Sequence, residues 1–225
     1  LQEKIYTSAQ NARGAYQTTA DAVAKLGNNA GSAFSSNDEI IAFVEQLNKS
    51  FVIAGTEASG IDAAMLQLTQ AMGSGVLRGE EYNSVLEQAP NIVQNIAKYI
   101  EENEDVLSAV AARMGMKVED LSGNVEKYLK DIASEGIISA EMVKAALFYA
   151  AEETNENFES MPMTWNQIWT SFKNDSLMAF QPVLQKINDL ANNEEIQGFI
   201  DRITESLFVL SDIALAIFDG IGQAA

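Results

Sequence analysis

The sequence predicts an all-α protein: a multi-helix bundle of short helices with a long N-terminal helix and a C-terminal αα-hairpin. Three observations support this fold class. Proline, which breaks helix interiors, occurs only three times in 225 residues. Apolar residues recur at spacings of three and four along most of the chain. No stretch keeps the strict alternation of apolar and polar residues that predicts a half-buried strand.

Residues 1–27 predict the first helix. Apolar and small residues there are spaced alternately by four and three, which is a heptad pattern. Two interpretations are open: an amphipathic helix packed on its own domain, or the end of a longer coiled coil. Because the chain begins with Leu1 rather than Met, we expect a piece of a longer protein. The residues of this pattern are Ile5, Ala9, Ala12, Tyr16, Thr19, Val23 and Leu26.

Residues 28–37 are rich in Gly, Asn and Ser and predict a linker. Residues 38–160 then predict a compact domain of short helices separated by glycines. Ser36 and Glu39 have the spacing of a capping box, in which each side chain bonds a free amide at the helix start. Ser139 is a second predicted N-cap.

Residues 161–225 predict a long helical hairpin. One apolar stripe runs from Trp165 to Leu190, with Pro182 expected to kink the helix or to start a new one. A second stripe follows over 196–221. Its most apolar part, 207–218, is too short for a membrane span of about 20 residues, so membrane contact is not expected. Uncovered stripes of this kind favour self-association.

The composition limits the chemistry available. The chain has 14 Lys and Arg against 32 Asp and Glu, a formal net charge of −18, and neither Cys nor His. Disulfides, Cys/His zinc sites and Ser-His-Asp or Cys-His catalysis are therefore impossible. The charge repels a phosphate backbone, so no nucleic-acid partner is expected.

Carboxylates remain as candidate catalytic groups, but their spacing argues against that role. The three adjacent acid pairs cannot face one substrate, because neighbours on a helix point about 100° apart. No calcium-loop or phosphate-loop pattern occurs. We therefore predict no catalytic, metal or cofactor-binding residue, no cofactor and no enzymatic activity. The pairs are Glu80–Glu81, Glu101–Glu102 and Glu152–Glu153.

One segment, residues 73–90, has the character of a signature. Its glycines permit a tight turn, and Leu77 can insert from that turn into the core. Glu80 and Glu81 start the next helix, where negative charge is favourable. Pro90 suits the first position of a further helix. From its residues alone, this segment is a structural device without a reactive group.

This segment resembles the tape measure domain of tailed-phage tail tape measure proteins. The resemblance covers about residues 38–175, with extra length at 101–113 and 124–130. It is carried by two blocks of residues. The first block contains Gly75, Leu77, Gly79, Glu80, Glu81, Asn83, Gln88 and Pro90, and the second contains Gly115, Leu121 and Gly136.

The resemblance implies a virion structural protein that sets tail length during assembly and later leaves the tail tube. It implies a location in the tube lumen, and in the host cytoplasm during assembly. The implied partners are the tail tube protein, tail assembly chaperones and tail tip proteins. We further hypothesise that residues 1–27, about 40 Å as one helix, end an upstream rod. The alternative, which composition allows, is a helical interaction module of a secreted or sensor protein.

Overall fold

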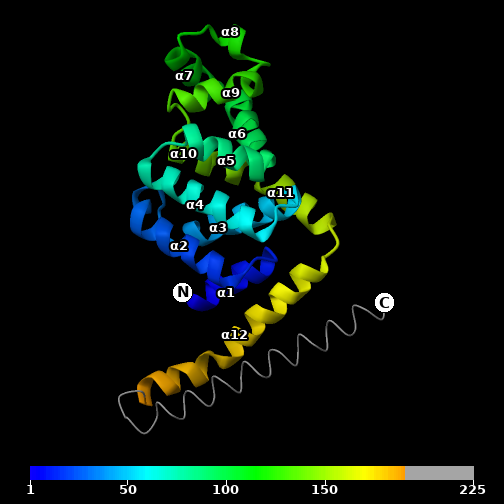
Figure 1. The fold of residues 1–225 in the computed structure, drawn as a ribbon. Coiled ribbons are helices and arrows are strands. Elements are labelled where there is room, and N and C mark those ends of the chain that lie inside the picture. The colour runs from blue at the N-terminus through cyan, green and yellow to red at the C-terminus, as the bar shows by residue number, and fades with distance from the viewer. Residues whose placement is uncertain (191–225) are drawn as a thin grey trace. The chain divides into compact units, whose positions relative to one another are not determined.

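The computed structural model describes residues 1–190, and the regular secondary structure of this range is helical except for one isolated bridge (Figure 1). The predicted all-α, multi-helix fold class is confirmed. The helices are α1 (Gln2–Asn11), α2 (Tyr16–Asn29), the short 3₁₀ helix η1 (Gly31–Ala33), α3 (Asn37–Ala54), α4 (Ala58–Ser74), α5 (Gly79–Gln88), α6 (Pro90–Glu102), α7 (Glu104–Met114), α8 (Val118–Leu121), α9 (Val125–Ser134), α10 (Ala140–Tyr149), α11 (Ala151–Ser160) and α12 (Trp165–Leu190).

The chain divides into two compact units, residues 1–174 and 175–225. The first unit has one continuous apolar core to which α1 to α10 contribute. Helices α3 and α6 lie at its centre: α3 packs against α1, α2, α6, α10 and α11, and α6 packs against α3, α5, α7, α9 and α10. Helices α7, α8 and α9 lie at the end of this unit opposite α1 (Figure 1).

The long N-terminal helix predicted over residues 1–27 is wrong, because the chain forms two helices there. Helix α1 ends in a Schellman motif: the N–H of Gly14 donates to the carbonyl of Ala9 (2.8 Å), and the N–H of Arg13 donates to that of Gln10 (3.1 Å). The left-handed position of this motif is held by Arg13, with φ of 54°, rather than by a glycine. The usual sequence signal for a helix end is therefore displaced by one residue.

The heptad residues nevertheless face one side, because both helices pack on the same core. Six of the seven are buried, with Ile5, Val23 and Leu26 in the core itself, and Tyr16 is partly buried against it. This outcome agrees with the interpretation of an amphipathic segment packed on its own domain. Residues 1–27 are therefore not one helix of about 40 Å, and the hypothesis that they end an upstream rod stays a prediction.

The predicted helix starts at Ser36 and Ser139 are confirmed. The N–H of Glu39 donates to Ser36 Oγ (3.2 Å), and that of Met142 donates to Ser139 Oγ (3.1 Å). The capping box is shifted by one residue, since Glu39 Oε2 accepts from the N–H and hydroxyl of Ser35 rather than from Ser36.

Helix α12 continues through Pro182, so no new helix starts at that residue. The second stripe of the predicted hairpin, 196–221, lies outside the described residues. As domain boundaries, the divisions after residues 27, 37 and 160 remain a prediction. Within residues 1–190, every helix falls short of the length or apolarity that crossing a bilayer requires.

Candidate functional site: the junction of the two signature blocks

The start of the first signature block meets the end of the second and the residues that follow it, although about 60 residues of sequence separate Leu77 from Ile138. The N–H of Leu77 donates to the carbonyl of Ile138 (2.8 Å), and the N–H of Ala140 donates to that of Gly75 (2.9 Å). These bonds form an isolated antiparallel bridge between Val76 and Ser139. We call residues 75–79 and 136–140 together the motif junction. It joins the connection between α4 and α5 to the connection between α9 and α10.

Leu77 anchors the motif junction in the core. Its side chain is fully buried, and those of Ile137 and Ile138 on the facing segment are buried as well. The residues that flank the anchor are glycines in the left-handed region, Gly75 with φ of 86° and Gly79 with φ of 54°. Because a side chain is strained at such φ values, these two positions explain the glycines of the signature. The predicted insertion of Leu77 into the core is confirmed.

Gly136 forms the other side of the motif junction and follows the C-terminus of α9, with φ of 64°. Its carbonyl accepts from Arg113 Nη2 (3.3 Å). Arg78 lies over it, since a Cβ at Gly136 would be 3.7 Å from Arg78 Nη1. Two guanidinium groups therefore lie at the negative end of the α9 dipole, where cations are favourable.

Gln88 and Pro90 lie at the opposite end of α5 and fix a second corner. The hydroxyl of Thr56 donates to the carbonyl of Gln88. The Gln88 side chain covers Gly60, where an added Cβ would lie 2.1 Å from Gln88 Oε1. Pro90 is the first residue of α6, as predicted. The signature thus fixes both ends of α5, one against residues 136–140 and the other against the turn between α3 and α4.

The remaining signature residues are not brought to the motif junction. Glu80 and Glu81 lie in the first turn of α5, and Asn83 is exposed on the same helix. Gly115 ends α7 with φ of 66°, and Leu121 is fully buried at the end of α8. The two blocks therefore supply the ends and turns of helices rather than one cluster of side chains.

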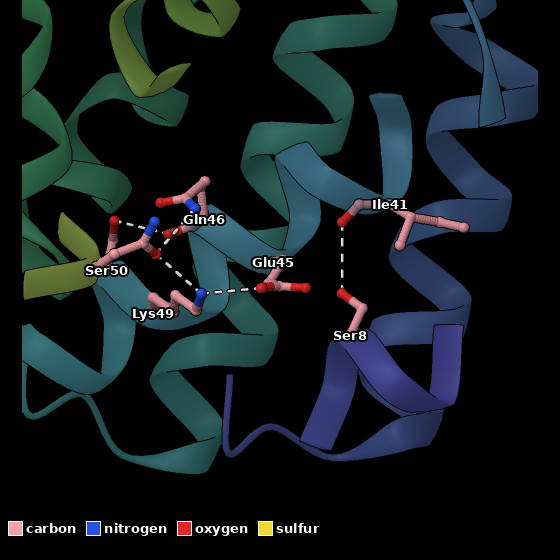
Figure 2. Close-up of polar contacts among 7 residues, drawn as sticks. Ser8, Ile41, Glu45, Gln46, Lys49 and Ser50 are labelled. Atoms are coloured by element: carbon pink, nitrogen blue, oxygen red, sulfur yellow. Dashed lines mark hydrogen bonds and ion pairs between the residues drawn. The ribbon is translucent and has the colours of Figure 1, made fainter. Parts of the chain in front are cut away.

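The sequence analysis missed a buried polar face on α3, part of which Figure 2 shows. Lys49 pairs with Glu45 (2.9 Å) and donates to Asn155 Oδ1 on α11 (2.9 Å). Gln46, which is buried, donates to the same oxygen (3.2 Å), and Ser50 Oγ donates to the Gln46 carbonyl (2.8 Å). The sequence did carry a sign of this buried polar face. Apolar residues occur on almost every side of α3, which indicates a helix surrounded by others, whose polar residues are buried too.

The arrangement at the motif junction positions backbone, and its one hydroxyl, that of Ser139, accepts from the N–H of Met142. Glu39 is the one carboxyl of the described range whose pKa is strongly shifted, to about 2, by hydrogen bonds from Ser35 and then by Lys144. That shift belongs to a helix cap on the surface of the unit. Among residues 1–190, no three acidic side chains are grouped so that they could hold a metal ion.

The fold and the motif junction together define an all-helical structural module whose signature residues hold helix ends in place. A model of the family described as tape measure protein matches residues 1–189. The chain belongs to the tape measure protein family, whose members are structural proteins of phage tails. Neither a search of curated proteins nor a search of solved structures finds a match to the chain.

Proposed function

We propose that this chain is the part of a tail tape measure that helps to set tail length during assembly and is later released from the tube. The observation that carries the proposal is the family match over residues 1–189. The motif junction supports it, because the family signature serves to build a stable module rather than a reactive site.

The ruler role gives a quantitative expectation. A helix rises about 1.5 Å per residue, so residues 1–174 would add about 260 Å to a tail if they lay in it as one helix. Folded as a compact unit of this size, they would add only about 40 Å. Since the described unit is compact, we expect the smaller value.

The test is an in-frame duplication of residues 1–174 in the parent gene, with tail lengths measured by electron microscopy. An increase of about 40 Å supports a folded module on the tape, and about 260 Å supports an extended one. A tail that assembles with unchanged length would contradict the ruler role for this part of the protein. An insertion of equal length at the end of another tail protein is the matched control.

We further propose that the chain acts within the tail tube lumen, after synthesis and assembly in the host cytoplasm. Its partners there are the tail tube protein, tail assembly chaperones, tail tip proteins and further copies of itself. The net charge of −18 supports a place beside DNA without binding to it. Co-purification from infected cells with the chaperones before tails form, and with the assembled tube afterwards, would support both steps.

A further inference from the structure

Within the first unit, residues 165–174 of α12 contact the turn between α1 and α2 through a buried polar residue, Asn174. Only 2% of Asn174 is exposed. Its Oδ1 accepts from the N–H of Tyr16 (2.9 Å), and its Nδ2 donates to Gln10 Oε1 (3.0 Å) and to the carbonyl of Gly14 (2.8 Å). The side-chain amide thus connects both sides of the turn between α1 and α2.

Two further residues of α1 and the following turn, Gln10 and Arg13, also contact the chain after residue 157. Gln10 Nε2 donates to Ser171 Oγ (3.0 Å). Arg13 Nη1 donates to the carbonyl of Met161 (2.9 Å), and its guanidinium lies 4.3 Å from the centre of the Phe158 ring. The left-handed conformation of Arg13 forms the turn between α1 and α2. This turn places the Arg13 side chain and the carbonyl of Gly14 where they bond Met161 and Asn174.

The apolar side of this part of α12 points the other way. At about 100° per residue, Trp165 and Asn174 lie about 180° apart on the helix. Trp165 is 77% exposed, and Ile168 and Phe172 on the same side are exposed as well. The usual arrangement of an amphipathic helix, with its apolar side on the core, is therefore reversed here.

We propose that residues 165–174 form a strap that detaches from the turn between α1 and α2 while residues 1–160 stay folded, and that Asn174 holds it in place. Detachment exchanges polar contacts for contacts with water and exposes little further apolar surface, because Trp165, Ile168 and Phe172 are already exposed and Trp169 is partly exposed. Helices α1 to α10 cannot leave in this way, since their apolar residues form the core. Residues 161–164, which are not helical and include Pro162, provide the joint.

This device goes beyond the proposed role in tail length and does not depend on it. Detachment would let the chain after residue 160 separate from a unit that remains compact. The end-to-end distance of the chain would thus change between two values while residues 1–160 stay folded.

The amide of Tyr16 is a direct reporter of the strap. As the first residue of α2, Tyr16 has no hydrogen-bond partner for its N–H within that helix, and Asn174 supplies one. The experiment is amide hydrogen exchange by NMR on the 225-residue chain, with the buried Ile96 in α6 as the core reference. Exchange at Tyr16 should be nearly independent of low denaturant concentrations, because strap opening exposes little apolar surface. Ile96 should exchange with a steep denaturant dependence.

The variant Asn174→Asp keeps the shape of the side chain and removes both donors, so that a carboxylate faces the carbonyl of Gly14. We expect exchange at Tyr16 to become at least about tenfold faster, while Ile96 exchange changes by less than about twofold. The matched control is Asn166→Asp, the same change at an exposed residue of α12, which should leave both amides as they are in the parent chain.

Two results would overturn the proposal. Equal acceleration at Tyr16 and Ile96 in Asn174→Asp would make Asn174 an ordinary part of the core. Equal denaturant dependence at both amides in the parent chain would show that the strap leaves only when the unit unfolds. The second measurement needs no variant, so the proposal stays testable even if Asn174→Asp does not fold.

Discussion

Leu77 is the residue on which the motif junction depends most directly. Its side chain is fully buried, and its backbone is bonded to the facing segment. Truncation leaves a cavity between rigid turns that cannot close over it. We expect Leu77→Ala to lower the free energy of unfolding by about 2–5 kcal/mol, measured by urea denaturation.

Leu86→Ala is the matched control for this prediction, because Leu86 lies on α5 and is 40% exposed. We expect it to cost less than about 1 kcal/mol. If the two variants lost the same stability, the motif junction would not be the anchor that its geometry suggests.

Substitution by alanine is expected to change stability in opposite directions at Gly136 and at Gly27. Gly136 has φ of 64°, so Gly136→Ala should destabilise by about 1–2 kcal/mol. Gly27 lies within α2, and an added Cβ there would meet only Ile40 Cδ1, at 3.9 Å. Gly27→Ala should therefore stabilise, by up to about 1 kcal/mol through helix propensity. Thermal unfolding of both variants checks the signs, and a gain in stability at Gly136 would refute the backbone argument.

The carboxyl of Glu39 at the start of α3 predicts that the free energy of unfolding depends on pH. The pKa of Glu39 is lowered from 4.5 to about 2, first by the hydrogen bonds from Ser35 and then by Lys144, which pairs with it at 3.1 Å. Since the folded pKa lies below the unfolded one, the cap stabilises the fold fully above about pH 4.5. This contribution is lost as the pH falls from 4.5 toward 2.

The measurement is the stability difference between the parent chain and Glu39→Gln, determined by urea denaturation at several pH values. We expect the difference to be largest above pH 5 and to shrink steadily toward pH 2. Glu141→Gln removes one exposed carboxylate from the first turn of α10 and controls for the general loss of charge at a helix start. A difference that stays constant over this range would contradict the role of the shifted carboxyl.

Element ends were predictable wherever one side chain or one glycine determines them. Ser36, Ser139 and Pro90 mark helix starts in both sequence and structure, and Leu77 was placed correctly in the core. The break between α1 and α2 was not predictable in this way. Its left-handed residue is Arg13, and the heptad spacing continues across it because both helices face the same core.

The motif junction shows what sequence can and cannot establish about the candidate site. The identity of its residues followed from the two signature blocks, since glycines beside an apolar residue indicate a tight turn at the core. Their meeting could not be predicted, because the bridge from Val76 to Ser139 depends on how α4, α5, α9 and α10 pack. Asn174 was missed for a related reason: nothing in a local pattern indicates that the polar side of a helix is the attached one.

At the scale of the whole molecule, the charge of −18 predicts how the protein behaves toward DNA. A basic DNA-binding protein gains affinity as salt is lowered, because it releases more strongly condensed counterions. For this chain, lower salt extends the repulsion instead, since the screening length grows from about 8 Å at physiological salt to about 30 Å at 0.01 M. We therefore expect no retention of duplex DNA at either salt concentration in a gel-shift assay.

The arrangement of the basic residues makes this a demanding test. Six of the 14 cations lie between residues 78 and 130, and four of these lie on or directly beside α7, α8 and α9. If they formed a binding patch, retention would appear at low salt despite the net charge, and Lys127→Glu with Lys130→Glu would abolish it. Lys25→Glu, an exposed cation on α2, is the matched control. Retention that only the first pair of substitutions abolishes would contradict the proposal that the chain lies beside DNA without binding to it. The six cations are Arg78, Lys98, Arg113, Lys117, Lys127 and Lys130, of which Lys98 pairs with Glu153.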